Sequence, residues 1–411
     1  GERALFSALP LKMETFQMKK LICTLLTLAM LLGLAGCTTA PTGSGDASAG
    51  VTEPAGQDST EEPTGGTGLP GNRNPLTGEE TDTDISQNCP VAVMLNNIKQ
   101  ALPQSGNSKA DFFFEIPEEG GITRIMALYQ DISDVGTIGT VRSTRPYYVR
   151  LAVGHDAILT HCGGSSTAYY IIKKYMRNAD FNDMDCLNKG TNCAYSYFYR
   201  SQARLNAGYA TEHTMYTDSD KIQDYLKNGK DDVRTKHKKN FDAGLRFAED
   251  GTPDGASATD VDVEMSQYKN TTFQYNADKK TYAVGQFGTG YIDEANGNKQ
   301  VEVTNVLVIL TDISVVKEST KGHLSVSTTG TGTGYYISGG KYIPITWKKD
   351  SVTAPQRFYD QDGNELKLSV GKTFECMIDK SRDVKIDGKV LEKPADANEN
   401  DNEVDKMALA D

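Results

Sequence analysis

The run from residue 122 to residue 129, ITRIMALY, restricts the fold of this chain more than any other stretch. It is apolar on both faces apart from Thr123 and Arg124. A strand that is apolar on both faces must be covered on both sides, which is typical of a mixed α/β sheet. The sequence therefore predicts a buried strand here, and Arg124 needs a polar partner inside the protein.

A first helix follows this strand. Glycines at positions 136 and 139 indicate a turn region, after which Ser143 or Thr144 is placed to cap a helix. Pro146 suits the first helical position and Gly154 suits the end. We therefore predict a helix over residues 146–154.

A second strand and helix come next. Residues 157–161 read as a strand, and Gly163-Gly164 allows a tight turn. Ser165 or Ser166 is placed to cap a helix that runs to about residue 177. The order is strand, helix, strand, helix, and we expect the two strands to be parallel.

Parallel strands would bring both helix starts to the carboxyl end of one sheet. Free backbone NH groups and the positive end of a helix dipole favour anions, and arginine adds bidentate hydrogen bonds. We predict a ligand-binding crevice for an anion, formed by Arg124, Arg142, Ser143, Arg145, Gly163, Gly164 and Ser165. The alternative is that the arginines pair with Glu115, Glu118 or Glu119 and brace the sheet.

Three side chains are candidates for catalysis. Glu115 and Glu119 would supply the two carboxylates that glycan hydrolysis needs, and His213 is a candidate acid or base. The structural alternatives are a turn at Glu119-Gly120-Gly121 and a histidine that is satisfied by internal hydrogen bonds. Ser165 lacks the second glycine of a hydrolase nucleophile turn, so helix capping explains it more simply.

The first residues predict a location outside the cytoplasm. Lys19-Lys20 precedes an apolar run at residues 21–32, and this run is too short for a convincing membrane span. Residues 1–37 therefore read as a signal peptide, and Met18 is the expected start of the protein. The run ends in Leu-Ala-Gly-Cys and resembles the bacterial lipobox. This resemblance implies that Cys37 carries lipid and anchors the protein at the outer face of the cell membrane.

Two segments lack the apolar residues needed to fold. Residues 38–74 predict a disordered tether, and the acidic residues 392–411 predict a disordered tail. The net charge is −12, and removing residues 1–37, with four basic and two acidic side chains, lowers it to −14. An acidic surface argues against nucleic acid as a partner.

The segments between tether and tail predict two domains. We expect an α/β domain with a mixed sheet at residues 75–230, a linker at residues 231–258 and a mainly antiparallel β domain at residues 259–391. The strands predicted for the second domain cover residues 271–275, 281–284, 301–310, 335–337, 341–347, 365–368 and 373–378. They should close into a small sandwich or barrel. The GTGTG run at residues 330–334 precedes a strand rather than a helix, so we expect a flexible loop instead of a phosphate loop.

The cysteines predict one disulfide. Of the seven, Cys23 leaves with the signal peptide and Cys37 carries lipid. Cys186 and Cys193 are the plausible disulfide in an oxidising compartment. No paired two-cysteine spacing of the zinc-ribbon type occurs, so we expect no metal site and no cofactor.

Several motifs together resemble the YerB-like lipoprotein family of Gram-positive bacteria. They are PVAVMLNN at 90–97, LPQSG at 102–106, EEGGITR at 118–124, GTVRSTRPYYV at 139–149, HCGGSS at 161–166, VTNVLVIL at 303–310 and ITWKK at 345–349. The resemblance covers most of the chain after the tether and implies paired domains of unknown function. The chain departs from the family pattern at Glu212-His213-Thr214, where Pro-His-Asn is usual, and near Tyr291, where a histidine is often found.

Two functions are compatible with these observations. The first is a lipoprotein that binds or scaffolds an anionic component of the cell envelope, such as a wall glycan or polymer. The second is an envelope hydrolase or transferase that acts on wall glycans.

Overall fold

The computed structural model describes residues 66–177, 183–187, 195–229, 233–238, 241–317 and 319–395, all within one compact unit. The predicted signal peptide, Cys37, most of the tether and most of the acidic tail lie outside these residues. Within the described ranges, no helix is long and apolar enough to span a membrane.

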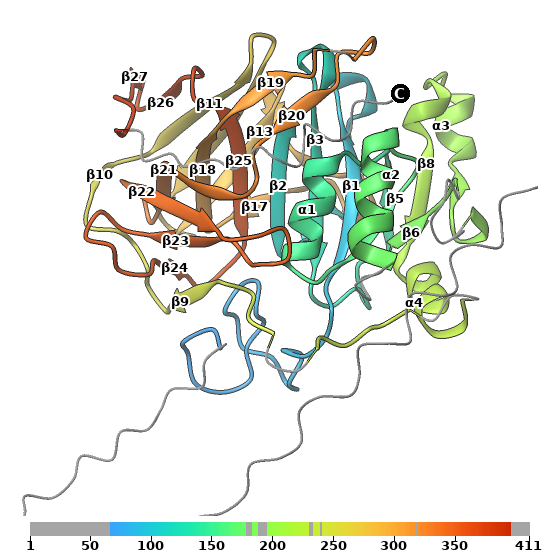
Figure 1. The fold of residues 1–411 in the computed structure, drawn as a ribbon, viewed down its shortest axis with the longest axis horizontal. Helices are drawn as coiled ribbons and strands as arrows, with labels where there is room; N and C mark the ends of the chain where they lie inside the picture. Colours follow the sequence, from blue (N-terminus) through green and yellow to red (C-terminus); the bar gives the residue numbers. More distant parts are fainter. Residues whose placement is uncertain are drawn as a thin grey trace, which may run out of the picture. The chain divides into compact units, whose positions relative to one another are not determined.

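An eleven-stranded sheet forms the centre of the fold (Figure 1). Its strand order is β10-β22-β21-β18-β25-β2-β3-β1-β5-β6, and β23 pairs with β22. The strands are β1 Val91–Asn97, β2 Phe112–Pro117, β3 Thr123–Tyr129, β5 Ile158–His161, β6 Asp183–Asp185, β10 Ala256–Ser257, β18 Asn305–Thr311, β21 Gly330–Ser338, β22 Lys341–Lys349, β23 Arg357–Tyr359 and β25 Thr373–Asp379.

The amino-terminal part of this sheet is mixed, as predicted. β1 lies between β3, to which it is antiparallel, and β5, to which it is parallel. The predicted strand-helix-strand unit is therefore wrong in one respect, because β3 and β5 run in opposite directions and are not neighbours. The earlier strand β1 lies between β3 and β5 and pairs with β5 in parallel.

A second, seven-stranded sheet comes from the later part of the chain, and its pairings are antiparallel. Its strands are β11 Asp260–Ser266, β12 Lys269–Asn276, β13 Thr281–Gln286, β14 Thr289–Gly290, β17 Glu302–Val303, β26 Val384–Ile386 and β27 Lys389–Val390. The fold class, an α/β part with a mixed sheet followed by a mainly antiparallel β part, is thus confirmed. Instead of closing into a separate barrel, however, the later strands β18, β21, β22 and β25 extend the large sheet.

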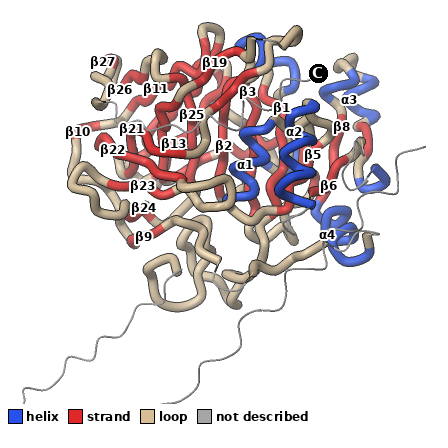
Figure 2. The backbone as a smooth tube through the Cα atoms, in the orientation of Figure 1, coloured by secondary structure: helices blue, strands red, loops and turns tan. Residues whose placement is uncertain are grey.

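The remaining elements are short. The helices are α1 Pro146–Gly154, α2 Ser166–Ile171, α3 Gln202–Asn206 and α4 Ser219–Asn228, and a π-helical turn, Ile172–Arg177, continues α2. The short strands are β4 Thr137–Gly139, β7 Tyr199–Arg200, β8 Met215–Asp218, β9 Arg246–Ala248, β15 Ile292–Asp293, β16 Lys299–Gln300, β19 Ile313–Val315, β20 Leu324–Val326 and β24 Lys367–Ser369. Figure 2 shows the α-helices gathered on the side of the molecule formed by the earlier strands.

Alternate residues of the central strands face two different apolar layers. Val93 and Leu95 pack in a cluster with Val261 and Phe273 of the second sheet. Met94, between them, packs in a cluster that contains residues of α1 and α2. Figure 1 shows α1 and α2 in front of the large sheet. Both faces are covered, which explains why these strands carry so few polar residues.

The ordered part extends beyond the predicted domain limits. Arg73 and Asn74, placed at the end of the predicted tether, are buried, and Asn74 donates a hydrogen bond to Asp111 at 3.2 Å. The predicted linker contains β9 and β10, and its Leu245 and Phe247 are buried. Gly, Pro and Asp suggested a linker here, whereas two apolar side chains fasten the segment to the core.

The predicted GTGTG loop is instead the first half of β21. An added Cβ at Gly332 would lie 2.5 Å from Trp347 Nε1, and one at Gly334 would lie 2.2 Å from the Val308 carbonyl oxygen. The glycines therefore permit close packing against the neighbouring strands.

A buried ion pair joins the two parts of the chain. β2 pairs in parallel with β25, and beside this pairing Lys269 Nζ of β12 donates a hydrogen bond to Glu115 Oε1 of β2. Thr271 and Gln286 donate to the other carboxylate oxygen at 2.8 and 3.0 Å. Both charged side chains are buried, so each depends on these partners.

Replacing Lys269 should therefore be strongly destabilising. We expect Lys269→Met to lower the free energy of unfolding by about 3–5 kcal/mol, because it leaves the Glu115 carboxylate buried without its counter-charge. Urea unfolding at neutral pH measures the change. The matched control is Lys279→Met, which breaks the exposed pair with Glu302 and should cost less than about 1 kcal/mol. Equal losses in the two variants would contradict a structural role for the buried pair.

A second prediction concerns Glu375 of β25. Its side chain is buried, neither carboxylate oxygen accepts a hydrogen bond within the described part of the chain, and burial raises its pKa to about 8. The folded-state pKa of Glu375 lies above its unfolded-state value, so between these two values the carboxyl group is protonated in the folded protein and ionised in the unfolded protein. The free energy of unfolding therefore falls as pH rises towards 8.

Glu375→Gln should escape this loss because glutamine stays neutral. We expect its stability relative to wild type to increase between about pH 5 and about pH 8. Urea unfolding midpoints of both proteins across that range measure the difference. A difference that does not change with pH would show that Glu375 has an ordinary pKa.

Candidate functional site

The two helix starts meet at one rim of the large sheet, as predicted. The Thr144 backbone NH donates to the Gly163 carbonyl at 2.9 Å, and the Cys162 NH donates to the Arg142 carbonyl at 3.0 Å. The Arg142 NH in turn donates to the Met94 carbonyl at 2.9 Å, near the carboxyl end of β1. Residues 141–145 thus lie beside the carboxyl ends of β1 and β5, which brings the starts together although β3 runs the opposite way.

Two of the three arginines are neutralised inside the protein. Arg124 Nη1 lies 2.8 Å from Glu118 Oε2, and Arg145 holds Glu119 through two hydrogen bonds of 2.7 and 2.9 Å. Burial raises the pKa of Glu118, whereas Arg145 outweighs the effect of burial on Glu119 and lowers its pKa. For Arg124 and Arg145, the structure therefore has the ion pairs of the bracing alternative.

The predicted small and polar groups also bond internally. Ser143 Oγ donates to the Cys162 carbonyl at 3.0 Å, and the Gly163 NH donates to Asp185 Oδ1 at 2.9 Å. Ser165 caps α2 by accepting from the Ala168 NH at 3.1 Å, as its sequence context indicated. Gly164 forms a bridge with Thr144. These four predicted residues therefore take part in hydrogen bonds or backbone pairing within the protein.

Arg142 differs from the other two arginines because no carboxylate of the described residues forms an ion pair with it. Its side chain is half-buried, and its Nε, like that of Arg124, is buried without a hydrogen-bond partner. No other residue in the described ranges forms an ion pair or a hydrogen bond with its guanidinium. Burial and the nearby Arg124 lower its pKa, but a guanidinium stays charged at physiological pH. Arg142 is thus a cation with one buried donor, Nε, that no described residue satisfies.

His213 lies near Arg142. The Val141 NH donates to the Met215 carbonyl at 2.7 Å, which places the segment after His213 beside the Arg142 loop. Asn96 Nδ2 lies 2.9 Å from His213 Nδ1, an arrangement in which Nδ1 accepts and Nε2 carries the proton. Burial, reinforced by Arg142, lowers the pKa of His213. The histidine is therefore neutral near pH 7.

Glu115 and Glu119 do not form a free carboxylate pair. Glu115 is fully buried, and both of its oxygens accept hydrogen bonds in the network with Lys269. Glu119 is held by Arg145. Neither carboxylate has the freedom that a general acid or a nucleophile would need.

The structure pairs Cys186 with Cys162, not with Cys193 as predicted. The Cα atoms of Cys162 and Cys186 are 4.8 Å apart, and Cys193 lies outside the described residues. β5 and β6 run parallel, with His161 opposite Asp185, so the next residue of each strand comes side by side. The sequence did not show this register, so it gave no reason to pair Cys186 with Cys162.

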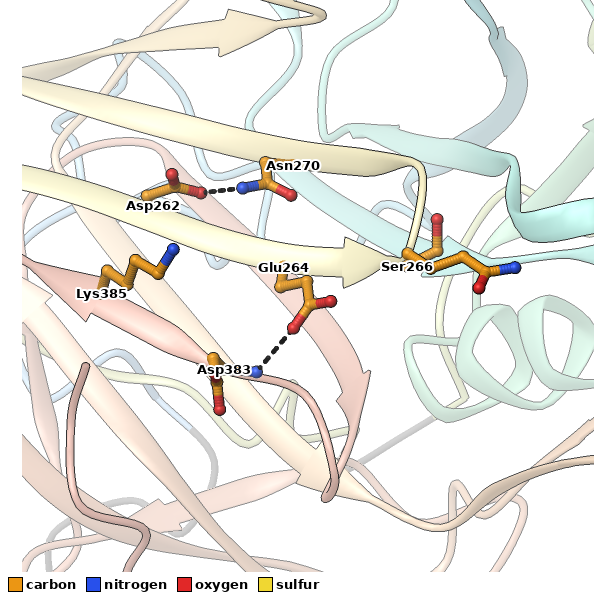
Figure 3. A pocket seen from close by; sticks show the side chains of 7 residues that line it. Asp262, Glu264, Ser266, Asn270, Asp383 and Lys385 are labelled. Carbon is orange, nitrogen blue, oxygen red and sulfur yellow. Dashed lines mark hydrogen bonds between the residues drawn. The ribbon is translucent and has the colours of Figure 1, made fainter.

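A separate pocket of about 270 Å³ lies on the second sheet (Figure 3). Its lining is Asp262, Glu264, Ser266, Gln267, Asn270, Asp383 and Lys385. Asn270 donates to Asp262 at 2.6 Å, and the Asp383 NH donates to Glu264 at 3.1 Å. The pocket has three carboxylates and one lysine, which makes it unsuitable for an anion. The rim therefore remains the candidate anion site.

Sequence reasoning missed two residues that organise these sites. Asp185 holds the Gly163 turn, and the Tyr169 hydroxyl also donates to it at 3.0 Å. Lys269 neutralises Glu115 from the other half of the chain. Asp183 and Asp185 are two positions apart, which is the period of a strand, and this spacing was the available signal for Asp185. Nothing local pointed to Lys269.

Comparisons with known proteins identify the family. Residues 76–232 match the amino-terminal domain, and residues 261–374 the carboxyl-terminal domain, of the "Protein of unknown function (DUF3048)" family. The chain is 30% identical to "Putative lipoprotein YerB" of Bacillus subtilis (strain 168) over 308 residues, which is 73% of this chain and 84% of that protein. The chain belongs to this family.

The fold agrees with that of a solved family member. The crystal structure of the YerB protein from Bacillus subtilis is similar with a TM-score of 0.63 at 26% identity, covering 76% of this chain and 99% of that one. The resemblance seen in the motifs is thus confirmed. The chain is a YerB-like lipoprotein of a family whose function is unknown.

The disulfide pairing can be checked directly. We expect peptide mapping of the unreduced protein to recover a peptide that contains Cys162 linked to one that contains Cys186. The control is the peptide with Cys376, a buried free thiol, which should be recovered unlinked. A Cys186–Cys193 peptide as the main product would contradict the pairing.

Proposed function

We propose that this lipoprotein is anchored to the outer face of the cell membrane through lipid on Cys37 and binds an anionic component of the cell envelope, such as a wall polymer or glycan. The proposal rests on one observation. Arg142, at the rim where the two helix starts meet, has a buried Nε without a hydrogen-bond partner. A buried donor on a charged group is costly unless a partner satisfies it, and an anionic oxygen is the natural partner.

The charges around Arg142 favour an anion. Arg124 and Arg145 are balanced by Glu118 and Glu119. The carboxylates that act on Arg142, those of Glu118 and the exposed Glu212, do so through space and form no ion pair with it in the described ranges, so its donors stay available to an anion. A neutral His213 close by adds a proton donor at Nε2 without changing the charge.

The alternative function, a hydrolase or transferase for wall glycans, has less support. Its two carboxylates, Glu115 and Glu119, are held by Lys269 and Arg145. His213 alone has no activated partner within the described part of the chain, since its Nδ1 is taken by Asn96. We therefore favour binding over catalysis.

The test is binding of the purified protein to a poly(glycerol phosphate) chain and to a neutral glycan. We expect the phosphate polymer to bind and Arg142→Ala to weaken it by about 10- to 100-fold, which is the effect of losing one hydrogen bond to a charged group. Arg142→Lys should have an intermediate effect because lysine keeps the charge but lacks the planar fork. Isothermal titration calorimetry measures both.

The matched control is Arg382→Ala. This variant also removes one arginine charge, but at the turn before β26, where Arg382 pairs with Glu264 of the second sheet at 2.9 Å. Its binding should stay within about twofold of wild type. Equal binding of wild type and Arg142→Ala would remove the rim from the proposal. If the neutral glycan bound as tightly as the phosphate polymer, the proposed preference for an anionic ligand would be contradicted.

A further inference from the structure

Three potential metal ligands converge at the amino-terminal end of β1, away from the rim. They are Cys89, Asp156 and His237, and one donor atom of each lies within 4.8 Å of the others. All three residues are buried. They are far apart in the sequence, by 67 residues from Cys89 to Asp156 and by 81 from Asp156 to His237. No local sequence motif therefore predicts this cluster.

Backbone pairing places the three side chains together. β1 and β5 are parallel with Val91 opposite Ile158, so Cys89 and Asp156, each two residues earlier, come to the same end of the two strands. The Cys89 NH donates to the Thr235 carbonyl at 3.0 Å, which brings the segment of His237 alongside. The His237 ring stacks on Phe241 with centroids 3.9 Å apart, which fixes its orientation.

The donor atoms have nearly the spacing of a tetrahedral zinc site. Cys89 Sγ lies 3.7 Å from His237 Nδ1 and 3.8 Å from Asp156 Oδ2, and His237 Nδ1 lies 2.8 Å from the same oxygen. Zinc bond lengths and tetrahedral angles place such atoms about 3.3–3.6 Å apart. The shortest distance in the cluster joins His237 Nδ1 and Asp156 Oδ2, and it would need to lengthen by only about 0.5 Å. A metal ion would then replace the hydrogen bond between these two atoms.

The same geometry argues against a nucleophilic cysteine. In a Cys-His-Asp arrangement for catalysis, the thiol and the carboxylate contact opposite nitrogens of the imidazole ring. Here Cys89 and Asp156 both face Nδ1. Burial, followed by the Asp156 charge, also raises the pKa of the Cys89 thiol to about 12, which is the opposite of activation.

A cation already lies against two of these donors. Arg234 Nη1 is 3.3 Å from Cys89 Sγ and 2.9 Å from Asp156 Oδ2. The Arg234 side chain is 24% exposed and also bonds to Asp156 Oδ1 and the Lys236 carbonyl, so a metal ion would have to displace it from Cys89 and Asp156. The competing explanation is that Arg234 is the permanent counter-charge of Asp156.

We propose that Cys89, Asp156 and His237 bind a divalent cation of the zinc type. A thiolate, a carboxylate and an imidazole suit zinc, whereas calcium and magnesium prefer oxygen ligands only. Binding would replace the thiol proton with a metal–sulfur bond, and the thiolate and carboxylate would balance the two positive charges. The three ligands would leave one tetrahedral position for water, and the metal would tie residues 233–238 to the base of the large sheet.

The experiment starts from purified full-length protein stripped with a chelator and titrated with Zn²⁺ against a chromophoric competitor. We expect one Zn²⁺ per chain, and Cys89→Ser and His237→Ala should each weaken binding by at least about 100-fold. Co²⁺ should give the near-ultraviolet absorption of a thiolate-bound ion, and Cys89→Ser should abolish it. Arg234→Ala should bind Zn²⁺ as tightly as wild type or more tightly, because it removes the competing cation.

Two controls keep the result interpretable. Cys376→Ala removes the other buried free thiol and should leave Zn²⁺ affinity unchanged. Zn²⁺ should raise the thermal unfolding midpoint of wild type and of Arg234→Ala, but not of Cys89→Ser, and circular dichroism shows that each variant is folded. The proposal is overturned if wild type and Arg234→Ala both fail to bind Zn²⁺, or if Cys89→Ser and His237→Ala bind it like wild type.

Discussion

The parallel pairing of β2 with β25 is the contact on which the rest of the structure depends. Strands β1, β2 and β3 carry apolar residues on both faces, and α1 and α2 cover one of these faces. The later part covers the other face with its second sheet and extends the large sheet through β25. Glu115 and Lys269 neutralise each other beside this junction. A carboxylate that looked catalytic in the sequence therefore acts as part of the joint between the two parts.

Charge balance accounts for the rim in the same way. Glu118 and Glu119, in the turn before β3, form ion pairs with Arg124 of β3 and Arg145 at the start of α1, and these pairs position the loop of residues 141–145. Arg142 belongs to that loop and has no pair within the described ranges. The ion pairs and the unpaired arginine are thus parts of one arrangement. A braced loop can hold a charged side chain in place for a ligand at little entropic cost on binding.

β1 connects the two proposed sites. Its carboxyl end carries Asn96, which contacts His213 near Arg142, and its amino end follows Cys89. A central strand with both faces buried is among the most rigid parts of a protein, so each end can hold its neighbours in fixed positions. The two ends differ in chemistry, because hydrogen-bond donors gather at one and sulfur, oxygen and nitrogen ligands gather at the other.

The sequence by itself determined the order and type of the main elements. Local patterns gave α1 its limits at Pro146 and Gly154, a serine cap for α2 and a buried strand that differs from the predicted residues 122–129 by one residue, because these features depend on neighbouring residues. The predicted cap of α1 at Ser143 or Thr144 was wrong, since Arg145 precedes α1 without a side-chain cap hydrogen bond. Only the tertiary structure decided the partner of Cys186, the counter-charge of Glu115 and the meeting of Cys89 with Asp156 and His237. These contacts join residues far apart in the chain, and strand order and register, which local patterns do not encode, bring them together.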